Sequence, residues 1–391
     1  MPKRYRVGAI GFAHMHINTL LDRFADRPEV DWVACADTVP DVKPLSAVRD
    51  TRAANLKRAL EHTKIPKSYD DYREMLEKER FDIMIMCPEN AKHAEVVEAV
   101  AAKGIHMVVE KPMANTLGNA LRMARAARLN DVKLMINWPF TWSSSIRKAK
   151  ELLDQGVIGK VWEVRWRNGG NGGSMGPLAY GQVITDAEKG SEWWHQSNPG
   201  GGALLDYCCY GSVAASWYFG EPAQAAYGLK ANFFSHYGDA EDHAVITVRF
   251  PQALAVIEGT WSTPHVGVPT GPIIYGSEGT MVLDYPGNTQ VAVFRSQKKE
   301  QTHEALLANV NAKGLPRGFE PTEVYEGDPL PAGRTNLAEE FLHHLETGEP
   351  LHPLQDVPLN LRAMAILDAG ARSAKSGKLE LVNDDTWSIG Y

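Results

Sequence analysis

Gly8-Ala9-Ile10-Gly11-Phe12-Ala13-His14-Met15-His16 is the stretch that decides the fold of this chain. It joins an apolar strand pattern, Val7 to Ile10, to a helical pattern that begins at about His16. Glycines in such a loop let backbone amides approach a pyrophosphate at the helix start, as in the GxGxxG fingerprint. Gly11 suits the tight turn and Ala13 is small, but His16 takes the place of the third glycine. The stretch predicts a dinucleotide-binding strand and helix with an atypical phosphate loop.

The helix is predicted to reach Ala25, and a second strand, Val30 to Ala36, ends at Asp37. A carboxylate about 20 residues beyond the loop accepts hydrogen bonds from a ribose diol and repels a 2′-phosphate. Asp37 therefore predicts NAD rather than NADP, with a turn or helix-cap aspartate as the structural alternative. We expect His14 and Met15 to donate backbone amides to the pyrophosphate, and His16 to pack inside the first helical turn.

The rest of the first third of the chain alternates strand and helix patterns, which is typical of a parallel sheet covered by helices. Further strands are predicted at Ile83 to Met86, Met107 to Val109 and Lys133 to Ile136, with a helix over Leu117 to Leu129. We expect a dinucleotide-binding Rossmann domain over residues 1–135. Ligands bind at the carboxyl ends of such strands. The candidate cofactor-binding residues there are Gly11, Phe12, Ala13, His14, Met15, Asp37, Cys87, Pro88, Glu89, His93, Glu110 and Lys111.

A second informative stretch is Gly200-Gly201-Gly202-Ala203-Leu204-Leu205-Asp206-Tyr207-Cys208-Cys209-Tyr210. Its three glycines permit positive φ and close backbone approach, which suits a loop against a ligand. In a helix that starts after them, Asp206 and Tyr210 lie on one face, a turn apart. Two proton-handling side chains at that spacing indicate a catalytic site, and a buried helix with a structural Asp and Tyr is the alternative.

The second half of the chain shows alternating patterns between Gly and Pro turns, which predict antiparallel strands. These strands are expected at Gln224 to Ala231, His243 to Phe250, Leu254 to Trp261 and Thr280 to Leu283. We expect residues 136–391 to form an α+β domain with a large open, mostly antiparallel sheet. Two C-terminal helices, Asn336 to Glu346 and Val357 to Ser376, are expected to pack back across that sheet or onto the first domain.

One face of the second sheet carries too few polar residues to be fully solvated, which predicts a homo-oligomer, a dimer or tetramer. The segment Asn168 to Ser174 is rich in glycine and is predicted to be a flexible loop or lid. The stretch Gln297 to Arg334 is predicted to be a long surface excursion.

The composition is that of a globular chain, with 391 residues, 44% hydrophobic and 23% charged, and a net charge of −7. Two domains are the default at this length. Lys and Arg form no basic stripe, which argues against nucleic acid and anionic membranes as partners. We recognise no signal or membrane segment and expect a cytoplasmic protein. Four cysteines in apolar surroundings suit buried thiols, with a vicinal Cys208–Cys209 disulfide as the rare alternative.

Several motifs together resemble the Gfo/Idh/MocA family of oxidoreductases. Glu110-Lys111-Pro112 is similar to the EKP signature, Cys87-Pro88 with His93 to the strand-end loop, and Gly200 to Tyr210 to the glycine run and Asp motif. The turns at residues 156–159 and 276–279 and the strand at 242–250 extend the resemblance over nearly the whole chain. It implies a Rossmann domain, a C-terminal open-sheet domain and a nicotinamide cofactor.

Three positions depart from the family pattern. The phosphate loop lacks the second and third glycines. Tyr210 stands where many members have a histidine, as in members similar to glucose–fructose oxidoreductase, and Asn137-Trp138 stands where many carry an arginine. The resemblance therefore implies Tyr210 as proton donor and acceptor, and a substrate that needs no cationic clamp near Asn137.

Hydride transfer needs a base that takes the proton of the reacting hydroxyl. Lys111 and Tyr210 are the predicted pair, because a nearby ammonium favours the phenolate of a tyrosine, whose unperturbed pKa is about 10. Asp206 is expected to orient the substrate or hold Lys111, since a carboxylate is too weak a base for an alcohol. The predicted catalytic residues are Lys111, Asp206 and Tyr210, and no metal is expected.

Aromatic residues gather around the same segments, namely Trp138, Trp142, Tyr180, Trp193 and Trp194. Flat rings cover the apolar faces of sugars while polar neighbours bind hydroxyls. This pattern favours a sugar, glycoside or cyclitol as substrate. The predicted substrate-binding residues are Asn137, Trp138, Trp194, His195, Asp206 and Tyr210.

Two other classes of function stay open. His14-Met15-His16 after a first strand has the HxH spacing with which metal-dependent hydrolases of the amidohydrolase type begin a TIM barrel. The antiparallel second half argues against such a barrel. A sugar- or nucleotide-sensing protein could keep the oxidoreductase fold without turnover. The set Lys111, Asp206 and Tyr210 favours an enzyme.

Overall fold

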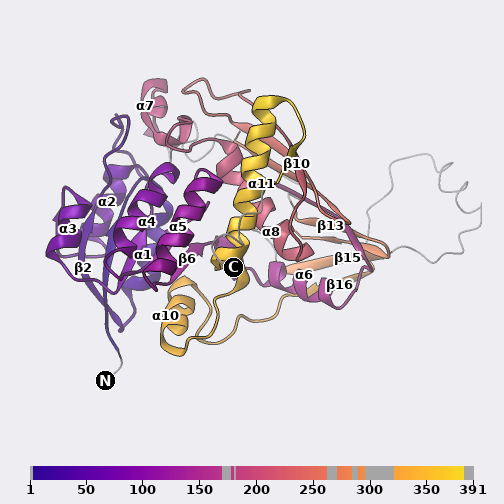
Figure 1. The fold of residues 1–391 in the computed structure, drawn as a ribbon, viewed down its shortest axis with the longest axis horizontal. Helices are drawn as coiled ribbons and strands as arrows, with labels where there is room; N and C mark the ends of the chain where they lie inside the picture. Colours follow the sequence, from indigo (N-terminus) through magenta and orange to yellow (C-terminus); the bar gives the residue numbers. More distant parts are fainter. Residues whose placement is uncertain are drawn as a thin grey trace, which may run out of the picture.

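The computed structural model describes residues 3–169, 178–179, 182–261, 271–283, 289–295 and 321–382. Figure 1 shows two sheets side by side, one in indigo and purple surrounded by helices and one in pink and orange. The long yellow helix α11 (Val357–Ser376) contacts α5 of the first domain as well as strand β10 and helix α8 of the second.

The first sheet is parallel and has the strand order β3-β2-β1-β4-β5-β6. Its strands are β1 (Tyr5–Ile10), β2 (Val30–Ala36), β3 (Ser68–Tyr69), β4 (Ile83–Met86), β5 (His106–Glu110) and β6 (Leu134–Asn137). Its helices are α1 (His16–Ala25), α2 (Arg52–Glu61), α3 (Tyr72–Lys78), α4 (His93–Ala101) and α5 (Leu117–Leu129). This is the Rossmann order, in which ligands bind where the order reverses between β1 and β4. The predicted Rossmann domain is confirmed.

Local patterns explain these elements. Every residue of β4 and β6 is buried, as expected for parallel strands covered on both faces. Helix α1 buries Ile17, Leu20, Leu21 and Phe24, which follow the spacing of one helical face. The side chain of Thr116 accepts the amide of Asn119 and so caps α5.

The second sheet has the strand order β16-β15-β14-β13-β7-β12-β11-β10-β17. Its strands are β7 (Val161–Gly169), β10 (Ala225–Ala231), β11 (His243–Arg249), β12 (Leu254–Thr260), β13 (Ile273–Gly276), β14 (Gly279–Val282), β15 (Gln290–Arg295), β16 (Glu323–Glu326) and β17 (Glu380–Leu381). Among its described pairs, only β7 with β12 is parallel. The predicted open, mostly antiparallel sheet is confirmed.

Helices cover one face of this second sheet. They are α8 (Cys209–Phe219), which contacts β7 and β12, and α11, which contacts β10 and β11. The side chains of Tyr227 and Leu229 alternate with Gly228, which faces Gly370 of α11, so they point away from that helix and are exposed. Two further helices, α6 (Ser144–Asp154) and α7 (Asp186–Ser191), and a short pair, β8 (Leu178–Ala179) with β9 (Gln182–Val183), complete the domain.

The structure places two segments differently from the predicted division at residue 135. Strand β6 extends to Asn137 and belongs to the first sheet, because its backbone pairs with β5. Helix α10 (Leu337–Thr347) packs on α1, and its Leu337 and Phe341 join the core that contains Tyr5 and Ile17. The C-terminal helices therefore divide, with α10 on the first domain and α11 against the second sheet.

The structure also bears on the predictions for the cysteines, the membrane segments and the surface loops. All four cysteines are buried and free, so Cys208 and Cys209 form no vicinal disulfide. Within the ranges the structure describes, no helix is long and apolar enough to cross a membrane. The predicted lid falls mostly outside the described residues, as do Tyr180 and most of the stretch from 297 to 334.

Candidate active site

The glycine run at 200–202 lies against the first domain. The side-chain amide of Asn90, just after β4, donates to the carbonyl of Gly200 at 2.8 Å. Gly200 has φ +90°, and a Cβ there would lie 2.8 Å from the Cβ of Asn90. The sequence predicted a loop against a ligand, whereas the structure shows the glycines permitting close contact between the two domains. This contact brings the residues after Gly202 to the strand ends of the first sheet.

Lys111 and Asp206 form a buried ion pair across the domain boundary. The ammonium of Lys111, one residue past β5, donates to Asp206 Oδ1 at 2.7 Å and to its main-chain carbonyl at 2.9 Å. Trp261 donates its indole N–H to the other carboxylate oxygen at 3.0 Å. Burial alone would lower the pKa of Lys111, but Asp206, together with Tyr210, Cys209 and Glu110, outweighs burial and holds that pKa well above its ordinary value. Lys111 therefore stays protonated, and both carboxylate oxygens of its partner Asp206 accept hydrogen bonds.

Tyr210 lies beside this pair. Asp206 belongs to a π-helical turn, Leu204–Cys208, and Tyr210 to the first turn of α8. The ammonium of Lys111 lies 4.9 Å from the centroid of the Tyr210 ring. That ring is 6% exposed and meets Trp138 edge-on, with ring centroids 5.4 Å apart. The three predicted catalytic residues are thus brought together around Lys111.

Most backbone amides of the phosphate loop donate hydrogen bonds to other parts of the protein. The amide of Gly11 donates to the carbonyl of Ala36, and that of Phe12 to Asp37 Oδ1 at 2.9 Å. The amide of His14 donates to the carbonyl of Cys87, so the prediction that it is free for a pyrophosphate is wrong. The amides of Ala13 and Met15 have no hydrogen bond within the described part of the chain. Two orphan amides next to a helix start fit an anionic group such as a pyrophosphate.

The tight turn at Gly11 has a clear physical cause. Its φ is +85°, and a Cβ there would lie 2.4 Å from the backbone nitrogen of Pro88. Only glycine allows the loop after β1 to pass this close to the loop after β4. The first glycine of the fingerprint therefore keeps its role in this chain although the other two are missing.

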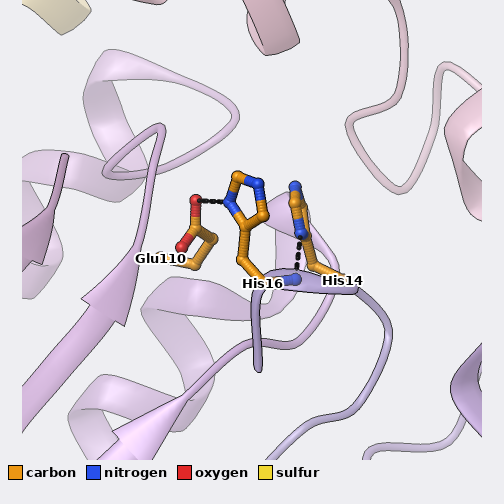
Figure 2. Close-up of side chains that lie close together, drawn as sticks. All are labelled: His14, His16 and Glu110. Atoms are coloured by element: carbon orange, nitrogen blue, oxygen red, sulfur yellow. Dashed lines mark hydrogen bonds and ion pairs between the residues drawn. The ribbon is translucent and has the colours of Figure 1, made fainter. Parts of the chain in front are cut away.

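Figure 2 shows His14, His16 and Glu110 close together at the ends of β1 and β5. His16 Nδ1 donates to Glu110 Oε1 at 2.9 Å, and Asn137 donates its amide to the other carboxylate oxygen at 2.7 Å. Burial would raise the pKa of Glu110, but the neighbouring His16 and Lys111 lower it below its usual value. His16 was expected to pack inside the first helical turn, whereas its side chain reaches out to the EKP glutamate because that buried carboxylate needs a partner.

The same three residues offer ligand atoms within 4.8 Å of one another, as a metal site would. The hydrogen bonds argue against this use. His14 Nδ1 accepts the backbone amide of His16 at 3.0 Å, so the proton of its neutral ring sits on the outward nitrogen Nε2. Burial, with the positive charges of His16 and Lys111, lowers the pKa of His14 well below its usual value. The outward atom is thus a neutral donor, which suits an acceptor group better than a cation. The hydrolase alternative is wrong in its fold, because the first sheet is open and forms no barrel.

Asp37 ends β2 as predicted, beside a cavity of about 270 Å³. The cavity is lined by Asp37, Thr38, Val39, Asp70, Asp71, Tyr72, Arg73, Lys92, Glu95 and Val96. Asp37 Oδ1 also accepts from Arg52, the first residue of α2, at 2.5 Å. Sequence reasoning missed Arg52. A cation in the first turn of a helix is unfavourable because it opposes the helix dipole. Its position could therefore have indicated a nearby carboxylate partner. A ribose site at Asp37 and an adenine-sized cavity next to it fit the adenosine half of a dinucleotide.

Three other predicted cofactor residues line the loop after β4. Cys87 and Glu89 are buried, and burial raises the pKa of both the thiol and the carboxyl. His93 opens α4 and its Nδ1 bonds to the carbonyl of Met113 at 3.1 Å, while its Nε2 has no partner in the described residues. Cys87 and Glu89 thus follow the end of β4, and His93 begins the helix after it.

The aromatic segment at 193–195 covers the phosphate loop. The indole N–H of Trp193 donates to the carbonyl of Ala13 at 2.9 Å, and Trp194 meets the His14 ring edge-on with centroids 4.4 Å apart. Burial lowers the pKa of His195 to about 4, so the ring is neutral, and its Nε2 is buried without a partner among the described residues. An orphan imidazole nitrogen beside Trp261, whose indole in turn bonds to Asp206, fits a substrate hydroxyl.

Trp138 does not fit its predicted role in substrate binding. Its ring is 1% exposed and packs against Phe140 and Tyr210, and its N–H donates to Asn360 of α11 at 2.7 Å. The ring fills the core where α11 meets the first sheet, so it has no free face for a sugar. Asn137, next to it, keeps a place at the strand end through its bond to Glu110.

Comparisons with known proteins agree with this geometry. Residues 6–138 match the model of an oxidoreductase family with an NAD-binding Rossmann fold, and residues 146–282 match the GFO/IDH/MocA C-terminal domain. The chain is 26% identical to myo-inositol 2-dehydrogenase from Thermotoga maritima over 65% of this chain and 71% of that protein. It is 25% identical to an NADP-dependent D-xylose 1-dehydrogenase from Haloarcula marismortui over 47% of this chain and 49% of that protein.

A solved structure of levoglucosan dehydrogenase, in complex with NADH and levoglucosan, has the same fold, with a TM-score of 0.70. It covers 98% of this chain and 100% of that chain at 20% identity. The two family models together span most of the chain, including the strand ends, the EKP motif and the glycine run. The NAD-binding strand ends, the buried lysine and the matching models lead to one conclusion: this chain belongs to the Gfo/Idh/MocA family of NAD(P)-dependent oxidoreductases.

Proposed function

We propose that this protein is an NAD-dependent dehydrogenase that oxidises a secondary hydroxyl, or reduces the corresponding ketone, of a sugar, glycoside or cyclitol. The observation that carries the proposal is the buried pair of Lys111 and Asp206 beside Tyr210, at the edge of the sheet where dinucleotides bind. The names of the relatives, which act on myo-inositol, xylose and levoglucosan, support this class of substrate.

The cofactor would be held along the strand ends of the first sheet. The amides of Ala13 and Met15 suit the pyrophosphate, and Asp37 with the adjoining cavity suits the adenosine half. NAD, when bound, supplies a hydride acceptor for the carbon that carries the hydroxyl. Glu110, His93 and the loop at Cys87-Pro88-Glu89 complete the proposed cofactor site.

The proton chemistry is assigned to Tyr210 and Lys111. Because Lys111 stays protonated, it does not act as the base, and its charge favours a negative oxygen on Tyr210 or on the substrate. Tyr210 takes the proton from the reacting hydroxyl at its phenol oxygen and returns it in the reverse reaction. Asp206 positions Lys111 through two hydrogen bonds and leaves the substrate hydroxyls to Asn137, Trp194 and His195.

The decisive experiment is to release and identify any bound nucleotide, titrate the stripped protein with NAD and NADP, and then follow NADH absorbance with a panel of sugars, glycosides and cyclitols. Turnover with a member of the panel supports the dehydrogenase. Tight binding of NAD and of a sugar without turnover would instead indicate the sensing protein. Binding of neither nucleotide would contradict the proposal altogether.

We also propose that the protein forms a homo-oligomer in the cytoplasm. The exposed apolar side chains on the open face of the second sheet, including Tyr227, Leu229 and Leu254, support a subunit interface there. The free buried thiols support a reducing compartment. A monomer by light scattering at micromolar concentration would contradict the oligomer.

A further inference from the structure

The helix that follows the phosphate loop has few free amides at its start. The amide of His16 donates to the ring of His14 at 3.0 Å, and the amides of the next two residues donate to carbonyls of the loop. In a glycine-rich dinucleotide loop the donors at this helix start bind the pyrophosphate. Over residues 11–18, only the amides of Ala13 and Met15 have no hydrogen bond within the described part of the chain.

The side chain of His14 lies at this helix start and carries a donor on its outer edge. Its Nδ1 accepts the His16 amide, so the proton of the neutral ring lies on Nε2, at the opposite edge of the ring (Figure 2). The residue is 4% exposed, and its Nε2 has no hydrogen bond among the residues that the structure describes. The rings of His16 and Trp194, with centroids 4.2 and 4.4 Å from that of His14, hold the imidazole in this orientation. A buried, oriented donor of this kind requires an acceptor.

The surroundings of this donor favour a negatively charged acceptor. Burial, with the positive charges of His16 and Lys111, lowers the pKa of His14 well below its usual value, so the ring stays neutral. The same two positive charges attract an anion. Glu110, the carboxylate beside His16, accepts from His16 and Asn137 with its two oxygens, which offset its charge within the protein. A phosphate oxygen is therefore a stronger partner for this donor than a neutral group.

We propose that His14 binds the diphosphate of the dinucleotide through Nε2–H, together with the amides of Ala13 and Met15. The ring accepts a helix amide on one edge and donates on the other, and hydrogen bonds in such a chain polarise one another. His14 thereby replaces donors that the missing glycines of the loop would expose. The inference rests on the proposed cofactor site and goes beyond it by assigning a side chain, in place of backbone amides, to phosphate binding.

Two substitutions separate the two edges of the ring. In H14N the side-chain oxygen stands in the place of Nδ1 and can still accept the His16 amide, but nothing stands in the place of Nε2. In H14Q the side-chain nitrogen can reach the place of Nε2, whereas the acceptor for the helix is lost. We expect H14N to weaken NAD binding on the order of tenfold to a hundredfold, the size of one hydrogen bond to a charged group. H14Q should stay within about threefold of the wild type.

The ligands to titrate are NAD, ADP-ribose and adenosine, followed by calorimetry or tryptophan fluorescence. H14N should weaken NAD and ADP-ribose by the same factor and leave adenosine unchanged, because adenosine has no phosphate. A loss confined to NAD would place the contact at the nicotinamide. A rise in KM for the sugar alone would place it at the substrate. Either of these two results would overturn the inference.

H62N is the matched control. His62 follows α2, its side chain is 66% exposed, and its substitution should change none of these constants. If H14N fails to fold, H14Q is compared with H14L, because neither has an acceptor for the helix and only H14Q has the outward donor.

Equal affinity for NAD with and without the outward donor would overturn the inference and leave the proposed function standing. A wild-type protein that binds neither NAD nor ADP-ribose would overturn both.

Discussion

The two ends of the proposed cofactor cleft hold their cations in different ways. At one end Lys111 meets one carboxylate, Asp206, whose other oxygen accepts the indole N–H of Trp261. At the other end Arg52 is paired with two carboxylates, Asp37 and Glu89. The first end pairs one cation with one carboxylate, while the second pairs one cation with two. The lysine keeps its charge beside Tyr210, whereas the arginine holds Asp37 and Glu89 in place.

Breaking the pair at the Lys111 end should have the largest effect. Lys111→Met leaves Asp206 buried without its counter-charge, which we expect to cost about 3–5 kcal/mol of stability. Turnover should fall on the order of 10³-fold, because the charge that favours the reacting oxyanion is lost. Steady-state kinetics with NADH absorbance and urea unfolding measure the two effects. Lys103→Met, which removes an exposed surface pair with Glu77, is the matched control and should change neither. Full turnover in Lys111→Met would remove the role given to this lysine.

Tyr210→Phe tests the base separately from the ion pair. The variant keeps the ring in its packing against Trp138 but removes the phenol oxygen, so we expect kcat to fall on the order of 10²-fold to 10⁴-fold with little change in stability. Tyr207→Phe, in the neighbouring π-helical turn, is the control and should retain activity. If both variants behaved alike, the base would have to lie elsewhere.

Glu192→Gln tests a buried carboxyl of the second domain through the pH dependence of stability. The folded-state pKa of Glu192, about 7, lies above its usual 4.5. The unfolded chain therefore loses this proton at lower pH, and stability falls as pH rises from about 4.5 to 7. The neutral amide avoids that loss and should stabilise the protein by about 2–3 kcal/mol at pH 8 and by under about 1 kcal/mol at pH 5. Urea unfolding at both pH values measures this, with Glu61→Gln as control. An equal gain at both values would contradict the assignment.

Trp138→Phe should have the smallest effect. It tests whether Trp138 belongs to the core or to the substrate site. The change leaves the Oδ1 of Asn360 without its donor, which we expect to cost about 1–2 kcal/mol of stability. KM for the sugar should not move, because the ring faces the core. Trp194→Phe, whose ring lies on His14, should instead raise KM. The reverse pattern in the two variants would restore Trp138 to the substrate site.

The sequence predicted the first domain best where a single physical signal dominates. Helix α1 and strands β2 and β4 have the predicted bounds, because a continuous apolar run or a clear apolar stripe is enough to identify them. Helix α2 was missed because it buries only Asn55 and Ala59 and so shows almost no apolar stripe. The parallel pairing of β7 with β12 was missed because these strands lie far apart in the chain and no local pattern encodes their register.

The candidate site shows the same contrast between local sequence signals and long-range contacts. The candidate residues Lys111, Asp206, Tyr210 and Asp37 could be predicted because they stand in short motifs whose chemistry can be read locally. The use of the His14 amide was predicted wrongly, since its acceptor, the carbonyl of Cys87, belongs to another strand. Arg52 was missed because it stands in no motif and its partners, Asp37 and Glu89, are remote in sequence.

The amino-acid sequence by itself determined the strand-helix alternation, the strand-end polar residues and the family of this chain, because apolar periodicity and compact motifs act over a few residues. The tertiary structure alone decided which carboxylate neutralises which cation, which amides stay free and that Trp138 belongs to the core. The physical reason is that charge pairing and burial depend on distances between elements, and those distances are set only when the two domains pack together.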